Sequence, residues 1–176
     1  MVTRGRTRSA PNPWLVLRRS SIQGRGVYAR RDIPSGTRLI EYTGERISNA
    51  EADRRDEEAR NTRHHTFLFI LSRRTVIDAR YGGNASKYIN HSCDPNCEAR
   101  FEGVHIWVHA IRDIRAGEEL AYDYEYDWEP DYTLDDLAEY ACHCGSDNCR
   151  GTMVDLPPDR LQMGRELLVR QTRATA

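Results

Sequence analysis

Two absences set the first limits on this protein. The sequence has no long hydrophobic run, and the only apolar run near its start is Trp14–Leu17. A membrane-spanning helix needs about 20 apolar residues, and the core of a signal peptide needs about 7 to 15. Lysine is almost absent as well, since Lys87 is the only one among 26 lysine and arginine residues. The first absence argues against a membrane protein, and the second is typical of a GC-rich bacterial genome, so we expect a bacterial-type cytoplasmic protein.

The five cysteines are too few for a disulfide-rich scaffold, and their placement is uneven. In a reducing compartment, cysteines are metal ligands or buried thiols rather than disulfides. Three of them form the pattern Cys142-x-Cys144-x4-Cys149, which offers three soft ligands, whereas a structural zinc ion needs a fourth. Cys93 and Cys97 are both candidates for that ligand. The alternative is a set of reduced thiols in the core.

Charge of one sign is missing from two segments. Residues 1–31 contain eight arginines and no acidic residue, and residues 118–139 contain ten acidic residues and no basic one, although the formal net charge is only -1. A basic arm can touch nucleic acid, and an acidic surface attracts basic substrates. Solvated faces explain the basic arm at least as well. A DNA-binding zinc finger is a further interpretation, which the neutral overall charge and the absence of a basic recognition helix oppose.

The pattern of apolar residues predicts one mostly β domain. Short apolar or alternating runs bounded by Gly, Pro, Ser or Asp are typical of strands; they occupy 16–17, 27–29, 38–42, 67–71, 75–78, 104–111 and 120–126. Helices are expected at 50–60, after the capping box Ser48-x-x-Glu51, and at 133–141 and 160–170. Residues 1–13 lack periodicity and are expected to be a mobile basic arm.

One internal similarity is visible. Residues 29–39 and 110–120 match at Ala, Arg, Asp, Ile, Gly and Leu positions. A single match is not a solenoid repeat, so it indicates two similar corners with a glycine at each turn.

Two short motifs suggest a binding site. In Tyr122-Asp123-Tyr124 the alternation of a strand places both phenols on one face, where aromatic rings attract a cation and hydroxyl groups orient an amine. Sheet packing is the usual role of such tyrosines. Gly24-Arg25-Gly26 is a tight turn that lets the backbone approach a ligand, although many such turns only change the direction of the chain.

Longer motifs carry a resemblance to a known family. The runs Ile22–Val27, Glu41–Glu45, Gly83–Asn96 and Gly117–Tyr124, followed by the cysteine pattern, resemble SET-domain protein lysine methyltransferases over about residues 14–154. The most specific of these motifs is Asn-His-Ser-Cys-x-Pro-Asn at 90–96. No cysteine-rich region precedes the similarity, so the resemblance is to a compact version with only the trailing zinc segment.

The resemblance implies a fold and a division of the chain. The fold is expected to be mostly β with short helices, β-clip-like, with a C-terminal pseudoknot, which is an exception to the usual absence of threading, and a small zinc-bound C-terminal segment. The expected parts are the arm 1–13, the SET domain 14–128, the zinc-binding post-SET segment 129–154 and a tail 155–176 with helical character. The apolar positions of 161–169 would support a dimer, so monomer and dimer both remain open.

The resemblance also assigns a site. It implies transfer of a methyl group from S-adenosylmethionine to the side-chain amine of a lysine in a basic protein such as a histone. Tyr124 would orient the amine, and Tyr122, at a position that varies between Tyr and Phe in the family, would favour monomethylation. The residues implied for the cofactor are Gln23, Gly24, Arg25, Gly26, Phe67, Asn90, His91 and His143. Those implied for one structural zinc ion are Cys93, Cys142, Cys144 and Cys149, which leaves Cys97 as a spare thiol.

Two positions depart from the family pattern. Lys87 stands where relatives often have Arg, and Phe67 stands where a channel tyrosine is common, so we expect weaker alignment of the amine. The alternative function is a non-catalytic SET-like zinc module that binds a peptide or nucleic acid. A histone substrate also gives an alternative location, the nucleus or chromatin, including that of a host. Direct contact with nucleic acid is expected at most through the N-terminal arginines, and no membrane partner is expected.

Overall fold

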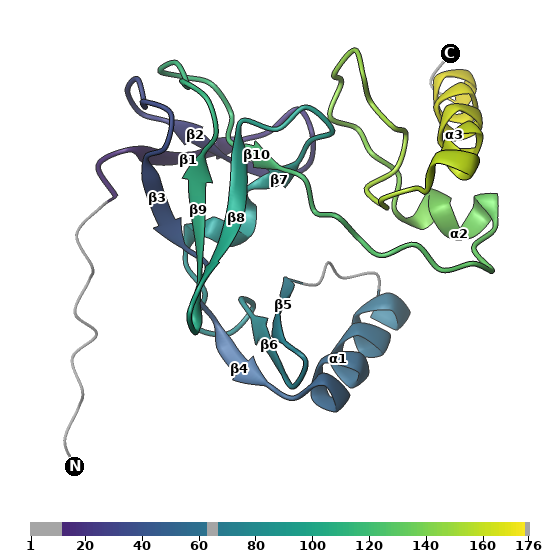
Figure 1. Ribbon diagram of the computed structural model, residues 1–176, viewed down its shortest axis with the longest axis horizontal. Coiled ribbons are helices and arrows are strands. Elements are labelled where there is room, and N and C mark those ends of the chain that lie inside the picture. Colours follow the sequence, from purple (N-terminus) through teal and green to yellow (C-terminus); the bar gives the residue numbers. More distant parts are fainter. Residues whose placement is uncertain (1–11, 63–66, 175–176) are drawn as a thin grey trace.

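The structure is a computed structural model that describes residues 12–62 and 67–174. In this part of the chain the strands form four small sheets, with α1 beside β4–β6 at one end of the molecule and α2 and α3 at another (Figure 1). The strands are β1 (Leu15–Arg19), β2 (Arg25–Ala29), β3 (Arg38–Glu41), β4 (Glu45–Ile47), β5 (Leu68–Ser72), β6 (Thr75–Asp78), β7 (Asn90–His91), β8 (Cys97–Glu102), β9 (His105–Ala110) and β10 (Ala121–Tyr122). The helices are α1 (Asn49–Thr62), α2 (Leu134–Glu139) and α3 (Leu161–Ala174), with 3-10 turns η1 (Ala85–Tyr88) and η2 (Pro158–Arg160). The prediction of a mostly β fold with short helices is confirmed.

The main core lies between the β1–β2 hairpin and the antiparallel sheet β3-β9-β8. Val27, Ile89, Val108 and Leu120 meet there, and none of them is more than 1% exposed. Burying a branched side chain of this kind stabilises the fold by about 1.5 to 3 kcal/mol relative to leaving it in water. This core therefore holds the turn after β1, the start of β7 and the segment before β10 in fixed relative positions.

The two similar segments found in the sequence pair with each other. Ile33 and Ile114 exchange backbone hydrogen bonds of 2.8 and 2.9 Å, and each side chain is 1% exposed. Two flanking contacts occur in both directions. Asp32 of the first segment accepts from Ala116 N, and Asp113 of the second accepts from Ser35 N. Likewise, Ala110 O accepts from Gly36 N, and Ala29 O accepts from Gly117 N. The sequence match thus reflects two corners related by an approximate twofold axis.

Some predicted elements differ from the observed ones. The sequence pattern does not predict β4 or β8, because many of their side chains are charged and exposed; backbone pairing with the more buried β6 and β9 holds them in place. The strand predicted over 120–126 is only Ala121–Tyr122, so the prediction is wrong for the remainder. Asp123 Oδ1 accepts a hydrogen bond from Glu125 N at 3.1 Å, and Glu125 has a φ of 50°, which turns the chain out of the sheet.

β10 pairs in parallel with β7, so Tyr122 lies opposite His91. This pairing places the Tyr-Asp-Tyr segment beside the Asn-His segment, although more than thirty residues separate them in the chain. The threading expected for a pseudoknot stays a prediction.

A separate apolar cluster holds the C-terminal helices together. Leu137 of α2 and Leu167 of α3 pack with Val154 and Leu156, and all are at most 5% exposed. The helices predicted near 133–141 and 160–170 are confirmed. No helix in the described ranges is long and apolar enough to cross a membrane. Residues 1–11 of the expected basic arm lie outside the described residues.

Candidate functional site

Tyr122 is the last residue of β10, and Tyr124 lies two residues beyond it. Their ring centroids are 5.0 Å apart, so the two phenols are neighbours although Tyr124 lies beyond the strand. The Tyr122 side chain is 7% exposed and its ring stacks on that of Phe69 at 6.2 Å. The ring of Tyr126 follows that of Tyr124 at 5.6 Å. These rings form an aromatic wall, which we define as Phe69, Tyr122, Tyr124 and Tyr126.

The hydroxyl group of Tyr124 has a fixed direction. It donates to Ile89 O at 2.8 Å, and the backbone N–H of Tyr124 donates to His91 Nδ1 at 3.1 Å. Burial, and then the neighbouring Tyr126, raise the pKa of Tyr124 above its usual value, and burial likewise raises the pKa of Tyr122. Both phenols therefore stay protonated at neutral pH and are not bases. Because its proton is directed at Ile89, the Tyr124 oxygen retains lone pairs that can accept from an amine.

Phe67 and Phe69 occupy different places. The ring of Phe67, which the resemblance implies beside the cofactor, lies 5.9 Å from that of Tyr88, and Lys87 Nζ lies 5.2 Å from the Phe67 ring centroid. Phe69 is the residue that lies against Tyr122. Sequence reasoning missed Phe69. The apolar run 67–71 contained the signal, because residues two apart in an extended chain share a face, so Phe69 lies on the same face as Phe67.

Asn90 faces the turn between β1 and β2. Its Nδ2 lies 3.1 Å from Arg25 O. Gly24 has a φ of 48°, in the left-handed region that favours glycine. A Cβ on Gly26 would clash with the carboxylate of Glu119. We call this arrangement the polar corner; it brings together Ser20, Gln23, Gly24, Arg25, Gly26, Asn90 and Glu119.

The two histidines expected near the cofactor differ in their surroundings. His91 is 3% exposed, and its Nε2 lies 3.4 Å from Cys93 Sγ. Because Nδ1 accepts from Tyr124 N, we assign the ring proton to Nε2, which then donates to the sulfur. The ring is thus used inside the protein, and a ligand would meet the backbone of His91. His143 is exposed between Cys142 and Cys144.

Four cysteines from two distant parts of the chain lie close together. The sulfur atoms of Cys93, Cys142, Cys144 and Cys149 lie within 4.8 Å of one another. Zinc–sulfur bonds of about 2.3 Å in a tetrahedron need sulfur atoms about 3.8 Å apart, and those of Cys93 and Cys142 are 3.7 Å apart. The hydrogen bond between the two sulfurs lowers the pKa of Cys93, whereas the same hydrogen bond and burial raise the pKa of Cys142, because the two thiols share a proton. The donor set fits a zinc ion.

Cys97, the other candidate ligand, lies elsewhere. It belongs to β8, its side chain is 0% exposed, and burial raises the pKa of its thiol to about 12. It is not among the four cysteines whose sulfur atoms gather.

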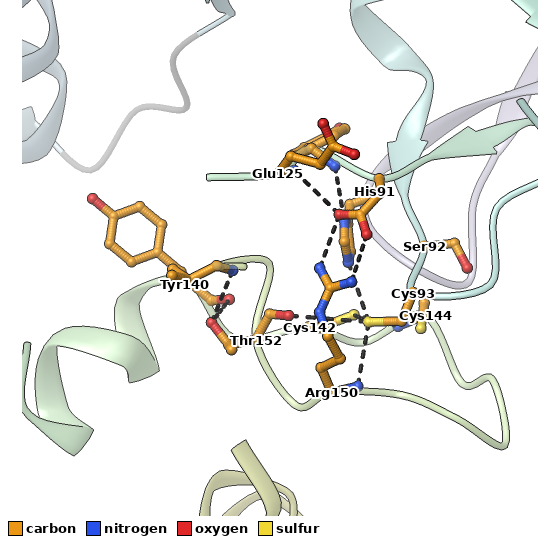
Figure 2. A network of polar contacts seen from close by, with 12 residues as sticks. His91, Ser92, Cys93, Glu125, Tyr140, Cys142, Cys144, Arg150 and Thr152 are labelled. Atoms are coloured by element: carbon orange, nitrogen blue, oxygen red, sulfur yellow. Dashed lines mark hydrogen bonds and ion pairs between the residues drawn. The ribbon is translucent and has the colours of Figure 1, made fainter. Parts of the chain in front are cut away.

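Arg150 links the cysteine cluster to the tyrosine segment (Figure 2). Its guanidinium donates two hydrogen bonds of 2.5 and 2.9 Å to Asp123, and its backbone N–H donates to Cys93 Sγ at 3.3 Å. Burial raises the pKa of Asp123, but hydrogen bonds from Arg150 and from the backbone of Glu125 outweigh it and lower that pKa. Since Asp123 stands between the two tyrosines, this clamp ties their position to the cysteine segment. Sequence reasoning missed Arg150, because only the fold brings it to Asp123.

These features define a class of protein, a small β-rich domain in which a tyrosine pair, a polar corner and a four-cysteine cluster converge. The model of the SET domain matches residues 24–125, more than half of the sequence. The chain belongs to the SET-domain family, and the resemblance and fold class predicted from the sequence are confirmed.

Several histone-lysine methyltransferases are similar to this chain. Histone-lysine N-methyltransferase trr of Drosophila melanogaster is 40% identical over 143 residues, 79% of this chain and 6% of that protein. Histone-lysine N-methyltransferase 2D of Homo sapiens is 41% identical over 143 residues, with coverages of 79% and 2%. The H3 lysine-4 specific enzyme of Saccharomyces cerevisiae is 39% identical over 142 residues, with coverages of 78% and 13%. The chain therefore spans only a small part of these relatives.

Among solved structures, a humanized mutant of the Chaetomium thermophilum Polycomb Repressive Complex 2 bound to the inhibitor GSK126 is similar to this chain. The TM-score is 0.55 at 40% sequence identity, over 62% of this chain and 14% of that one. The family match ends at residue 125. Cys142, Cys144 and Cys149 and the helices α2 and α3 therefore lie outside it.

Proposed function

We propose that this chain transfers a methyl group from S-adenosylmethionine to the side-chain amine of a lysine in a basic protein such as a histone, mainly to the monomethylated state. The observation that carries this proposal is the placement of Tyr124, whose hydroxyl is fixed by Ile89 O beside Tyr122. Membership of the SET-domain family and the histone-lysine methyltransferases among its relatives support the reaction type.

The polar corner would hold the cofactor. Gln23, Gly24 and Arg25 are exposed in its turn, and Asn90 contributes an amide that the turn carbonyls hold in place, so it offers the polar groups that an amino-acid moiety needs. His143 would cover the cofactor from the cysteine side. When bound there, S-adenosylmethionine would supply a methyl carbon on a positively charged sulfur; this carbon would pass to the lysine nitrogen as its bond to sulfur breaks, and the nitrogen would release a proton to solvent.

The lysine amine has to be neutral before it reacts. The reference pKa of lysine is about 10.4, so the amine is otherwise protonated. The aromatic wall removes water from the amine, which disfavours its charged form and lowers its pKa without a strong base. The Tyr124 oxygen accepts a hydrogen bond from the amine and aligns its lone pair, and such positioning supplies much of the rate. The Tyr122 hydroxyl occupies space near the nitrogen, which disfavours further methylation.

A structural zinc ion would complete the site. The four thiolates Cys93, Cys142, Cys144 and Cys149 leave no open position for a substrate, so the ion would act on structure rather than on chemistry. Because Cys93 lies only two residues after His91, zinc would fix the post-SET segment 129–154 against the polar corner, and its binding energy would stabilise that part of the fold.

Charge and relatives indicate the kind of substrate. Asp127, Glu129 and Asp131 are exposed on the segment that follows the aromatic wall, and a negative surface there attracts basic peptides. The names of the relatives specify histones, which favours the alternative location at chromatin, whereas nothing in the comparisons supports the cytoplasm. We retain both monomer and dimer as predictions.

Methyl transfer tests the proposal directly. Zinc-loaded protein would be incubated with labelled S-adenosylmethionine and either core histones or a mixture of basic proteins. Tyr124→Phe removes the oxygen that aligns the amine, and we expect at least about a hundredfold loss, the typical effect of misplacing a reacting group. Tyr81→Phe is the matched control, because Tyr81 is 51% exposed and lies outside the aromatic wall. Cofactor binding should persist in both variants. A folded wild-type protein that transfers no methyl group to any basic protein would favour a binding module instead.

A further inference from the structure

Glu119 has no cationic partner within residues 12–62 and 67–174. Its partly buried carboxylate accepts hydrogen bonds only from neutral groups there: Ser20 Oγ at 3.0 Å, the Tyr28 hydroxyl at 2.7 Å and Asn90 Nδ2 at 2.7 Å. The preceding acid, Glu118, is paired with Arg112. A partly buried charge without a counter-charge is unfavourable, so Glu119 provides an anionic position that a cationic ligand would satisfy.

The orientation of the Asn90 amide is a second, independent observation. Its Nδ2 faces four oxygens, at distances between 2.7 and 3.4 Å: Ser20 Oγ, Gln23 O, Arg25 O and Glu119 Oε1. The two carbonyls and the carboxylate can only accept hydrogen bonds, so the reversed amide would place its oxygen against three acceptors. The amide oxygen therefore points away from Glu119, and among the described residues no hydrogen bond to it is found.

We propose that Glu119 is a positioning residue that selects the amino-acid end of S-adenosylmethionine. It holds Asn90 Nδ2, so that Oδ1 accepts from the α-ammonium group of the cofactor, and its negative charge favours that cation. This inference rests on the proposed function, because the proposed function names the cofactor. It explains why a small residue is required at Gly26, where a Cβ would displace the Glu119 carboxylate.

The hydrogen bonds in this arrangement strengthen one another. An amide whose N–H₂ end donates to a carboxylate is polarised, and its oxygen becomes a better acceptor. Ser20 keeps the turn in place at the same time, because its Oγ donates to Glu119 and accepts from Ile22 N at 2.9 Å. A ligand with a positively charged amine thus gains from both Glu119 and Asn90, whereas a ligand without an amine gains from neither.

Two ligands separate this role from a merely structural one. S-adenosylhomocysteine carries the α-ammonium group, whereas 5′-methylthioadenosine shares the adenosine and the thioether but lacks the amino-acid part. Their dissociation constants would be measured by calorimetry on the full, zinc-loaded chain. We expect Glu119→Gln to raise the dissociation constant of S-adenosylhomocysteine about tenfold or more, the usual effect of losing a charge-assisted hydrogen bond. The same substitution should change the dissociation constant of 5′-methylthioadenosine by less than about twofold, since that ligand has no group that interacts with the charge.

Glu118→Gln is the matched control. It removes the same charge from the neighbouring residue, which contacts Arg112 and Asn96 outside the polar corner, and we expect it to change neither constant. Because Glu119 acts partly through Asn90, Glu119→Gln should weaken the binding of S-adenosylhomocysteine less in an Asn90→Ala background than in the wild type. In steady-state kinetics it should raise the KM for S-adenosylmethionine with little change in kcat. If Glu119→Gln fails to fold, Glu119→Asp keeps the charge but withdraws it from Asn90, and the same contrast between the ligands is expected.

Several results would overturn the inference. Equal weakening of both ligands would mean that Glu119 only keeps the turn folded, and unchanged binding of S-adenosylhomocysteine would remove its role altogether. Fully additive effects with Asn90→Ala would remove the connection through Asn90. A wild-type protein that binds neither ligand would overturn the proposed function as well, whereas wild-type binding that Glu119→Gln leaves unaltered would contradict this inference alone.

Discussion

At the scale of residues, His91 connects the cysteine cluster to the tyrosine that the proposed reaction depends on. Its Nδ1 accepts from Tyr124 N at 3.1 Å, and its Nε2 lies 3.4 Å from Cys93 Sγ. A thiolate bound to a metal remains a hydrogen-bond acceptor, so the imidazole has one orientation and one tautomer. The backbone of Tyr124 is consequently positioned by Cys93 as well as by the core, while the Ile89 carbonyl positions its hydroxyl.

In the proposed reaction, Tyr122 would limit how many methyl groups the lysine receives. We predict that Tyr122→Phe increases the share of di- and trimethylated lysine, because removing a buried hydroxyl beside Tyr124 leaves room for a methylated nitrogen to turn toward the methyl donor. The ring should stay in place, since its stacking on Phe69 at 6.2 Å does not involve the hydroxyl. Mass spectrometry of a methylated histone peptide measures the product distribution.

Tyr81→Phe serves as the control for this change too, because it removes a phenolic hydroxyl from an exposed position. An identical product distribution for wild type and Tyr122→Phe, at similar total turnover, would show that Tyr122 does not limit methylation.

At the scale of elements, α3 contacts the cysteine segment through its backbone. Gly164 lies in the first half of α3, and a Cβ there would clash with Arg150 O. In an ordinary helix Gly→Ala stabilises by up to about 1 kcal/mol, but overpacking against a backbone atom costs about 1 to 3 kcal/mol. We therefore predict that Gly164→Ala loosens α3 and the Arg150–Asp123 clamp that adjoins it. Trypsin cleavage within α3, which contains Arg165, Arg170 and Arg173, should accelerate.

Arg165→Gln provides a matched comparison for the proteolysis, since it changes an exposed residue beside Gly164 without adding volume at the contact. The rates of cleavage at Arg170 and Arg173 would be compared between the two variants. If Gly164→Ala is cleaved there no faster than this control, α3 tolerates the added methyl group.

The elements also show which parts of the fold a sequence pattern can predict. The 29–39 and 110–120 match was visible as two similar corners, but their pairing through Ile33 and Ile114 involves residues 81 positions apart, and no local pattern encodes such a distance. The prediction of a strand over 120–126 is wrong beyond Tyr122, because one local hydrogen bond, from Glu125 N to Asp123, turns the chain against its β propensity. Helices α2 and α3 were predicted because capping and periodicity are local properties.

At the scale of the whole molecule, the site is assembled from three distant parts of the chain: the β1–β2 turn, the segment from Asn90 to Cys93, and the segment from Glu119 to Arg150. The motifs identified the members of each part, because they contain rare residues at fixed spacing. The contacts that join the parts, Glu119 with Asn90 and Arg150 with Cys93, involve ordinary charged residues that look like surface positions in the sequence. Their roles depend on tertiary contact alone.

The proposed zinc ion would divide the five cysteines of the molecule into two groups, four ligands and Cys97, and this division is measurable. We predict that the zinc-loaded protein resists alkylation by iodoacetamide at about pH 8, where free thiols react as thiolates. Removing zinc with a chelator should expose Cys93, Cys142, Cys144 and Cys149 together. Cys97 should remain unmodified until denaturant is added, because it is 0% exposed and its pKa of about 12 leaves almost no thiolate. Peptide mapping by mass spectrometry identifies each modified residue.

Two substitutions test the same division from the protein side. Cys97→Ala should bind one zinc ion as the wild type does, since Cys97 is outside the group of four, whereas Cys93→Ala should lose zinc affinity and, through His91 and Arg150, the fixed position of Tyr124. Metal content and thermal unfolding of the two variants would be compared side by side. If Cys97 reacted upon chelation while Cys93 stayed protected, or if Cys97→Ala lost the metal, the fourth ligand would be Cys97, and zinc would then have no direct connection to the Asn90–His91 segment.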